Sequence, residues 1–157
     1  MKRHKLWMFL TLVAVLALSL AGCGAPKVDW TLEVTGGSTP LSLTYADLTK
    51  MTQVDLTDVL MQKSLGEDEV DSWSGVPVAE IFEQAGVQSY SSVTAAAADG
   101  YAVEISADEM ANAIVALKKN DDWITKAEPD KGPIRLVCPE TPANRWVFQV
   151  QQLQVNP

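Results

Sequence analysis

The sequence predicts an α+β domain with a mixed or mostly antiparallel β-sheet core and short helices. Apolar and polar residues alternate as in half-buried strands near both ends of the chain, over 28–34 and 145–155. Helix-capping pairs lie between these segments, for example Thr44 with Asp47. Short helices interspersed with strands in this way are typical of the α+β class.

The N-terminus predicts a secretory signal peptide over residues 1–22. Three basic residues within the first five precede the segment 6–20, which is apolar apart from one threonine and one serine. A basic start, a short apolar stretch and small residues at the end are typical of an export signal. Because a membrane-spanning helix needs ~20 residues, we expect this segment to be a signal peptide that is cleaved off.

The sequence LAGC at the end of that region predicts lipid modification of Cys23. It resembles the lipobox of bacterial lipoproteins, in which diacylglycerol with acyl chains such as palmitate is attached to the cysteine, which becomes residue one. Two or more acyl chains hold a protein on a bilayer, since each buried carbon contributes ~0.8 kcal/mol. We therefore expect residues 23–27 to form a lipidated tether on the extracytoplasmic face of the cell membrane. The alternative is an ordinary signal peptide with a chance cysteine.

The charge and residue content of the remaining chain exclude several function classes. Loss of the signal removes three of the twelve basic residues, so nine remain against twenty acidic ones and the net charge becomes −11. Such a surface argues against a nucleic-acid partner and against electrostatic adhesion to anionic lipid. The only histidine, His4, is lost, and Cys138 keeps no disulfide partner within the chain. Serine or cysteine triads and zinc sites built on His and Cys pairs are thereby excluded.

The first half of the domain, which begins at residue 28, contains three expected strands and two expected helices. The strands are 28–34, 41–44 and 53–61, and Thr44 with Asp47 caps a short helix that begins at Tyr45. The polar stretch 62–75 is expected to be irregular. Pro77 begins the clearest helix, which has one apolar face and ends at Gly86.

The second half is expected to contain a hairpin, one helix and two closing strands. Asp99-Gly100 lies between two β-capable runs within 92–105, which is a hairpin signal. Ser106 and Glu109 form a capping box that predicts a helix from 107 onward, and a loop is expected over 126–133. The closing strands are 134–138 and 145–155, with a bulge near Gln151-Gln152.

Several residues are candidates for chemistry, and each also has a structural interpretation. Trp73 and Trp146 can stack a ligand or fill the core. Arg135 and Arg145 can grip a phosphate or carboxylate, or form ordinary salt bridges. Cys138 ends an apolar strand, where we expect a buried hydrophobe rather than a reactive thiol. The acidic residues within 67–71 are expected to be a solvated loop rather than a calcium site, because they lack the ligand spacing of an EF-hand.

Taken together, five segments in this order resemble the oxidoreductase molybdopterin-binding domain, which has the sulfite-oxidase-like fold. The likeness spans about Trp30 to Val155. It implies an α+β fold of mixed sheets and, in the enzymes, a pterin held in a cleft with molybdenum bound by one cysteine. The segments are PLSLTYADL, WSGVPVAEIFEQAGV, AADGYAVEIS, GPIRLVCPE and RWVFQVQQLQV.

The same resemblance implies which positions hold the metal ligand and the basic residues that bind the pterin phosphate. The family's cysteine lies ahead of the WSGVP-like segment, but Met51–Ser72 contains no cysteine, and Cys138 falls in a later strand where the family usually has an aliphatic residue. The enzymes also use histidine and several basic residues around the pterin phosphate. Arg135 matches the arginine of the family's GPLR-like segment, and Arg145 with Trp146 matches a frequent basic–tryptophan pair.

These observations favour a binding module with no catalytic residues and no metal ligands. We expect a lipid-anchored domain of this fold, without a required cofactor, that holds a small ligand or an extracytoplasmic protein partner. A cleft lined by Trp73, Tyr101, Arg135 and Trp146, with Arg145 nearby, is the expected site. The alternative is a molybdopterin-dependent oxidoreductase, or a subunit of one, with an atypical metal site. The third hypothesis is a purely structural lipoprotein without a pocket.

Overall fold

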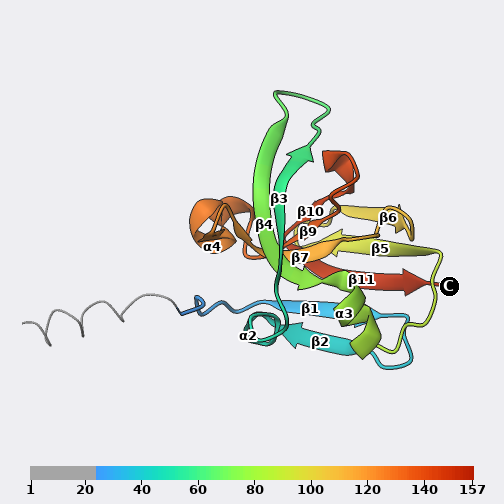
Figure 1. Ribbon diagram of the computed structural model, residues 1–157. Coiled ribbons are helices and arrows are strands. Elements are labelled where there is room, and N and C mark those ends of the chain that lie inside the picture. The colour runs from blue at the N-terminus through green and yellow to red at the C-terminus, as the bar shows by residue number, and fades with distance from the viewer. Residues whose placement is uncertain (1–23) are drawn as a thin grey trace, which may run out of the picture.

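The computed structural model describes residues 24–157 as two β-sheets with short helices (Figure 1). The expected signal peptide and the lipidation site Cys23 lie outside the described residues. No helix within 24–157 is long and apolar enough to cross a bilayer. The α+β class with mixed sheet pairing is confirmed, because one sheet contains both parallel and antiparallel strands.

The first sheet brings the two ends of the described chain together. Its strand order is β2-β1-β11-β5-β6, and β1 and β11 pair in parallel while the other neighbours are antiparallel. The ladder between β11 and β5 shifts register between Val150 and Gln152, which confirms the expected bulge. The strands are β1 (Thr31–Thr35), β2 (Leu41–Thr44), β5 (Ser92–Ala97), β6 (Ala102–Ser106) and β11 (Val150–Asn156).

The second sheet is antiparallel in the order β10-β9-β7-β4-β3, with β8 paired to β7. The long β3–β4 hairpin extends away from the rest of the domain (Figure 1). The strands are β3 (Val54–Met61), β4 (Glu69–Pro77), β7 (Ile114–Lys119), β8 (Asp122–Trp123), β9 (Arg135–Val137) and β10 (Val147–Phe148).

The helical segments are short. Thr44 and Asp47 form the expected capping box, in which each residue's side chain accepts a hydrogen bond from the other's backbone N–H. The helices are α2 (Tyr45–Leu48), α3 (Val78–Gln84) and α4 (Ile124–Ala127), with 3₁₀ turns η1 (Pro129–Lys131) and η2 (Ala143–Arg145).

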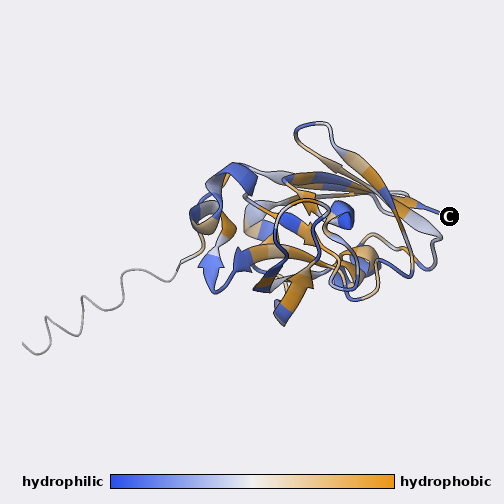
Figure 2. Ribbon diagram, turned by 90° about the horizontal axis from the view of Figure 1, so that it is seen from above, coloured by the Kyte–Doolittle hydropathy of each residue, from blue (hydrophilic) through white to orange (hydrophobic). Residues whose placement is uncertain are grey.

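Both sheets contribute to one hydrophobic core. Hydrophobic stretches run along the strands, whereas hydrophilic residues gather at several strand ends and connections (Figure 2). The alternation that predicted the strands therefore corresponds to real burial. Fully buried side chains include Leu32, Val34, Val93 and Leu153 of the first sheet and Val76, Val115 and Leu136 of the second.

Three local expectations are wrong. Residues 69–75 are strand β4 rather than loop, because the acidic side chains of Glu69 and Asp71 pair with Lys119 on β7. The Ser106–Glu109 capping box forms, but a turn follows it instead of a helix. Asn112 has a φ of 60°, which ends the turn, and the buried run from Ile114 continues as β7. The expected loop 126–133 contains the end of α4 and η1.

Candidate functional site

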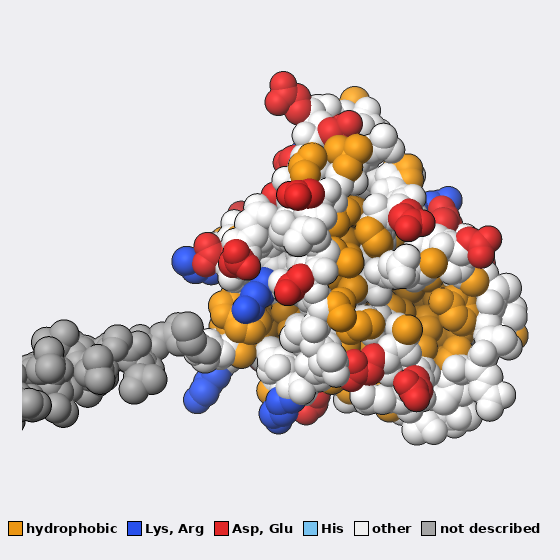
Figure 3. Space-filling model, viewed as in Figure 1, with side chains coloured by type: hydrophobic (Ala, Val, Ile, Leu, Met, Phe, Trp, Pro, Cys, Tyr) orange, Lys and Arg blue, Asp and Glu red, His pale blue; other side chains and the backbone are white. Residues whose placement is uncertain are grey.

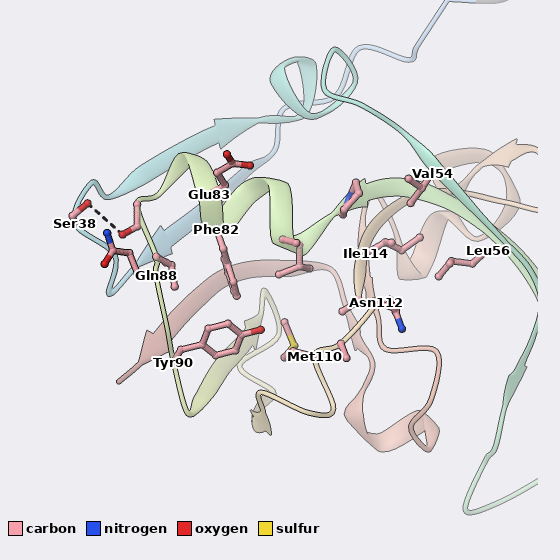
Figure 4. A pocket seen from close by; sticks show the side chains of 17 residues that line it. Ser38, Val54, Leu56, Phe82, Glu83, Gln88, Tyr90, Met110, Asn112 and Ile114 are labelled. Atoms are coloured by element: carbon pink, nitrogen blue, oxygen red, sulfur yellow. Dashed lines mark hydrogen bonds between the residues drawn. The ribbon is translucent and has the colours of Figure 1, made fainter.

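The candidate site is a cavity of about 730 Å³ that runs alongside α3 (Figure 4). Ser38 and Gln88 lie at one end, and Leu56 lies at the other. The side chains of Phe82, Tyr90 and Met110 lie between these ends. The volume falls within the range of sites that hold small molecules, about 300–1,000 Å³. The lining residues are Ser38, Val54, Leu56, Pro77, Val78, Ala79, Phe82, Glu83, Gly86, Val87, Gln88, Tyr90, Met110, Ala111, Asn112, Ala113 and Ile114.

Backbone hydrogen bonds fix both ends of α3 and so define the cavity. At its start, the Val78 N–H donates to the Ala113 carbonyl at 2.9 Å, which ties the helix to the turn before β7. At its end, the Thr39 N–H donates to the Ala85 carbonyl at 3.0 Å. Gly86 then takes a φ of +68°, and a Cβ there would overlap the Ser38 side chain. The positive φ favours glycine here, as its position after the helix predicted, and a Cβ would in addition displace the Ser38 hydroxyl.

Two aromatic rings form the centre of the cavity wall. Phe82 and Tyr90 pack edge to face, with ring centroids 5.3 Å apart and an interplanar angle of 84°. Burial raises the pKa of Tyr90, with the buried Cys138 contributing in the same direction, so the phenol stays neutral at physiological pH. A neutral phenol can donate a hydrogen bond and accept one.

The polar side chains of the lining are not paired with one another. The one hydrogen bond drawn among the lining residues in Figure 4 is from Ser38 Oγ to the Gly86 carbonyl, at 3.4 Å. The Tyr90 hydroxyl and the exposed Gln88 and Asn112 amides are joined by no dashed line to another residue drawn in Figure 4, and they are accessible to water or to a bound molecule. Glu83 is the charged residue of the lining, which contains no lysine, arginine or histidine. The cavity therefore combines apolar walls with neutral hydrogen-bonding groups and one carboxylate.

Three of the predicted site residues lie together, but they lie in the core. Trp73 and Trp146 are 1% exposed and Arg135 is 0% exposed. The indole rings of Trp73 and Trp146 pack edge to face with centroids 5.8 Å apart. The Arg135 guanidinium carbon lies 4.6 Å from the Trp73 ring centroid and 3.9 Å from that of Phe148. The cleft expected from the sequence also included Tyr101, and none of these residues lines the cavity beside α3.

The carboxylate of Glu128 compensates the charge of this buried arginine. Arg135 Nη2 donates to Glu128 Oε2, and Lys119 Nζ lies 3.3 Å from Glu128 Oε1 and 2.9 Å from Asp71 Oδ2. Burial by itself would raise the pKa of Glu128, but the charges of Arg135 and Lys119 hold it below its usual value. Arg135 Nε and Nη1 have no hydrogen-bond acceptor among the described residues, and they face aromatic rings instead.

The other two predicted site residues lie elsewhere on the surface. Tyr101 is 43% exposed, and its hydroxyl donates to the Asn144 carbonyl at 2.8 Å. Arg145 Nε lies 3.0 Å from Glu109 Oε1, and Nη1 donates to the Glu104 carbonyl at 3.2 Å. Neither residue lines the cavity. A ligand-binding role for the five predicted residues stays a prediction.

Sequence reasoning did not find the cavity itself. Its lining comes from four separated parts of the chain, near 38, 54–56, 77–90 and 110–114. Each apolar residue in these parts has the pattern of ordinary core packing, since periodicity reports burial and not the shape that the buried faces enclose. The segment WSGVPVAEIFEQAGV was the available signal, because it contains α3 and much of one wall.

The described residues do not fit the metal-bound pterin that the resemblance implies. Cys138 is fully buried, lies outside the cavity lining, and has a pKa raised to about 12 by burial, so its thiol is protonated and inaccessible. Residues 24–157 contain no group of three or more His, Cys, Asp or Glu side chains arranged to hold a metal ion. The cavity lining also offers no cation for a phosphate.

Comparisons with known proteins agree with the fold. A family model described as "Oxidoreductase molybdopterin binding domain" matches residues 23–157. Among solved structures, the chain is similar to the sulfane dehydrogenase SoxCD from Paracoccus pantotrophus, with 21% sequence identity and a TM-score of 0.73. The match covers 85% of this chain and 40% of that chain, so this chain spans less than half of its length. At this identity the likeness shows the fold alone. No curated protein sequence matches the chain.

Proposed function

Since the chain belongs to the oxidoreductase molybdopterin binding domain family, we propose that it uses this fold as a non-catalytic, lipid-anchored binding module. The observation that carries the proposal is the cavity beside α3, whose lining has space for a small molecule but neither a thiolate nor a cation. Soft thiolate ligands are what a site for a thiophilic metal normally supplies. The cavity supports binding of a ligand and supplies no residues for molybdenum chemistry.

The cellular position in this proposal rests on the N-terminal sequence. Residues 1–22 have the composition of an export signal, and LAGC ends in Cys23. Lipid on Cys23 holds the domain on the extracytoplasmic face of the cell membrane through the short tether 23–27. There the module presents its site to a small ligand or to an extracytoplasmic protein partner. With a net charge of −11 after processing, the domain itself is not attracted to anionic lipid.

The anchor is tested by substitution of each cysteine in turn. Cys23→Ser is expected to release the protein from the membrane fraction or to block processing. Cys138→Ala is the matched control, because it removes the other cysteine of the chain and leaves the LAGC sequence intact. Membrane fractionation and intact-mass measurement provide the readouts. A Cys23→Ser protein that is processed and still membrane-bound contradicts the anchor.

The binding role is tested by analysis of the full chain purified from its own host. We expect neither stoichiometric molybdenum by elemental analysis nor pterin by fluorescence after acid release. Stoichiometric molybdenum together with pterin would overturn the non-catalytic role. Pterin without molybdenum would support a non-catalytic binding role but would contradict the assignment of the site to the cavity beside α3, whose lining supplies no cation for the pterin phosphate.

Family membership favours one other candidate function. In this alternative the chain is a molybdopterin-dependent oxidoreductase, or a subunit of one, whose metal site is atypical or shared with a partner chain. The match to less than half of a longer chain is compatible with it. The same elemental analysis decides between the two candidates, and it must then be made on the chain purified together with any bound partner.

A further inference from the structure

We propose that the cavity beside α3 takes an uncharged, predominantly apolar small molecule of elongated shape that carries a carbonyl or hydroxyl group, and that it rejects anions. The inference rests on the proposed function, because it names the ligand class of that same site. It follows from the walls, the charge, the free polar groups and the shape of the cavity.

Apolar side chains from three parts of the fold form the walls. Phe82 and Val78 come from α3, Leu56 comes from β3, and Met110 and Ile114 come from the turn before β7 and its first residue. On the face of the molecule shown in Figure 3, hydrophobic side chains gather around the position of α3, with acidic side chains beside them. A ligand that fills such a site gains from the apolar area it buries, about 25 cal/mol per Å². The body of the ligand must therefore be apolar.

The charges exclude an anionic ligand. Glu83 is the charged group of the lining, and no lysine, arginine or histidine joins it there. An anion that entered would lose part of its hydration, lie near the exposed carboxylate of Glu83 and find no cation in the lining in compensation. Sulfate-like, phosphate-like and carboxylate-bearing molecules are disfavoured for the same reason.

The free polar groups define what the ligand carries. The Tyr90 hydroxyl lies beside Phe82 and Met110 in the middle of the cavity, with Gln88 toward one end and Asn112 toward the other (Figure 4). Each can donate a hydrogen bond and also accept one. A carbonyl or hydroxyl oxygen on the ligand satisfies them without introducing charge.

The shape of the cavity follows α3. The cavity extends from Ser38, near the C-terminal end of the helix, to Leu56, beyond its N-terminal end (Figure 4). The seven residues of α3 alone span about 10 Å at 1.5 Å per residue. A ligand that contacts both ends is therefore a rod or an extended ring system rather than a compact sphere.

Photolabelling tests this ligand class on the full chain, in whichever cell fraction holds it. The probes are neutral 4-methylbenzophenone and anionic 4-benzoylbenzoate, which share one benzophenone skeleton and differ in a carboxylate. Each is activated by light, and the labelled peptide is identified by mass spectrometry. We expect the neutral probe to label the peptides that contain Met110 and Phe82, and the anionic probe to label them at least about tenfold less, equivalent to ~1.4 kcal/mol.

Two variants, each with a matched control, locate the label. Ala111→Trp fills the cavity and should abolish labelling, whereas Ala98→Trp, at another exposed alanine outside the lining, should not. Glu83→Lys should admit the anionic probe, and Glu80→Lys, on the same helix but outside the lining, should not. Because Glu83 is exposed, its variant keeps the test valid even if Ala111→Trp does not fold.

The outcomes separate this inference from the proposed function. Equal labelling by both probes, or labelling that Ala111→Trp does not reduce, overturns the ligand class and leaves the binding module standing. Stoichiometric molybdenum with pterin in the purified chain overturns the binding module itself. Neutral-probe labelling that maps to the cavity, exceeds the labelling by the anionic probe about tenfold and is blocked by Ala111→Trp supports both.

Discussion

Replacing Glu128 with glutamine should destabilise the protein, because it leaves the charge of Arg135 buried without a counter-ion. Glu128 is the acidic residue within ion-pair distance of Arg135 among residues 24–157. The Arg135 side chain is 0% exposed, so water cannot take the place of the carboxylate. The substitution keeps the size and shape of the side chain and removes only its charge.

The expected cost follows from the geometry of the pair. Removal of one partner from a buried ion pair costs about 3–5 kcal/mol. Two features reduce this value here. The glutamine oxygen can still accept a hydrogen bond, and the Trp73 and Phe148 rings continue to stabilise the cation. We therefore expect the free energy of unfolding to fall by about 2–3 kcal/mol, which is a large part of a typical total of about 5–15 kcal/mol.

A second substitution tests whether the buried charge of Arg135 causes the loss of stability. Arg135→Met should destabilise the wild-type protein but should stabilise the Glu128→Gln variant. In that variant it removes an uncompensated charge, and the flexible thioether packs between the two rings. The control is Asp122→Asn, which breaks the exposed pair with Lys126, where the two side chains are 54% and 73% exposed. Its effect should stay below about 0.5 kcal/mol.

Urea denaturation followed by tryptophan fluorescence measures these differences, because Trp73 and Trp146 are buried in the native state. A loss of about 2–3 kcal/mol lowers the midpoint by roughly 1–2 M urea for a domain of this size. If Glu128→Gln changes the free energy of unfolding by less than about 1 kcal/mol, or if Arg135→Met destabilises both backgrounds equally, the pair does not stabilise the fold as argued.

The pH dependence of the same variant has a defined sign. The folded-state pKa of Glu128 is below the unfolded value, since Arg135 and Lys119 outweigh the effect of burial. Its stabilising contribution is therefore fully present above the unfolded value, near 4.3, and is lost as the pH falls through the folded pKa. The stability difference between wild type and Glu128→Gln should shrink on acidification below about pH 4. A difference that grows there contradicts the assigned direction of the shift.

Three further predictions concern local structure. Gly86→Ala should cost about 2 kcal/mol by urea denaturation, because the φ of +68° and the Ser38 side chain both oppose a Cβ. Gly66→Ala, at a φ of +84° with open space around it, should cost only about 1 kcal/mol, and equal costs would rule out the close contact. The Cys138 thiol should resist a disulfide reagent at pH 8 until urea unfolds the protein, so fast labelling of the native state would contradict its burial. Thr44→Ala should cost about 1 kcal/mol through loss of the capping box, and a change within error would mean that α2 is held by packing alone.

Local signals in the sequence were sufficient where one residue pair or one alternation decides the structure. The Thr44–Asp47 pair predicted α2, Asp99-Gly100 predicted the β5–β6 hairpin, and the slip near Gln151 predicted the bulge. Strand β4 was missed because its residues are acidic and polar. Glu69 and Asp71 read as a solvated loop until Lys119, far along the chain, is placed beside them.

The site shows the same division between local and long-range information. Core packing was one of the two interpretations of Trp73 and Trp146, but the burial of Arg135 was not expected, because the two rings and the acidic partner that receive it come from other strands and from the segment after α4. The cavity is a property of packing between α3, β3 and the turn before β7. A capping box at Ser106 is a valid local signal, yet only a turn follows it, because the buried run from Ile114 forms strand β7.

The parallel pairing of β1 with β11 also decides how the domain responds to mechanical load. The chain enters β1 at one end of the first sheet and leaves β11 at the other (Figure 1). A pull on residue 24 against the C-terminus therefore slides the two strands past each other, and it loads the hydrogen bonds of the ladder that places Glu33–Thr35 beside Gln152–Gln154 together rather than one after another. A domain pulled from its N-terminal side would unfold by shearing β1 from β11. Shearing two paired strands needs more force than peeling a strand from the edge of a sheet.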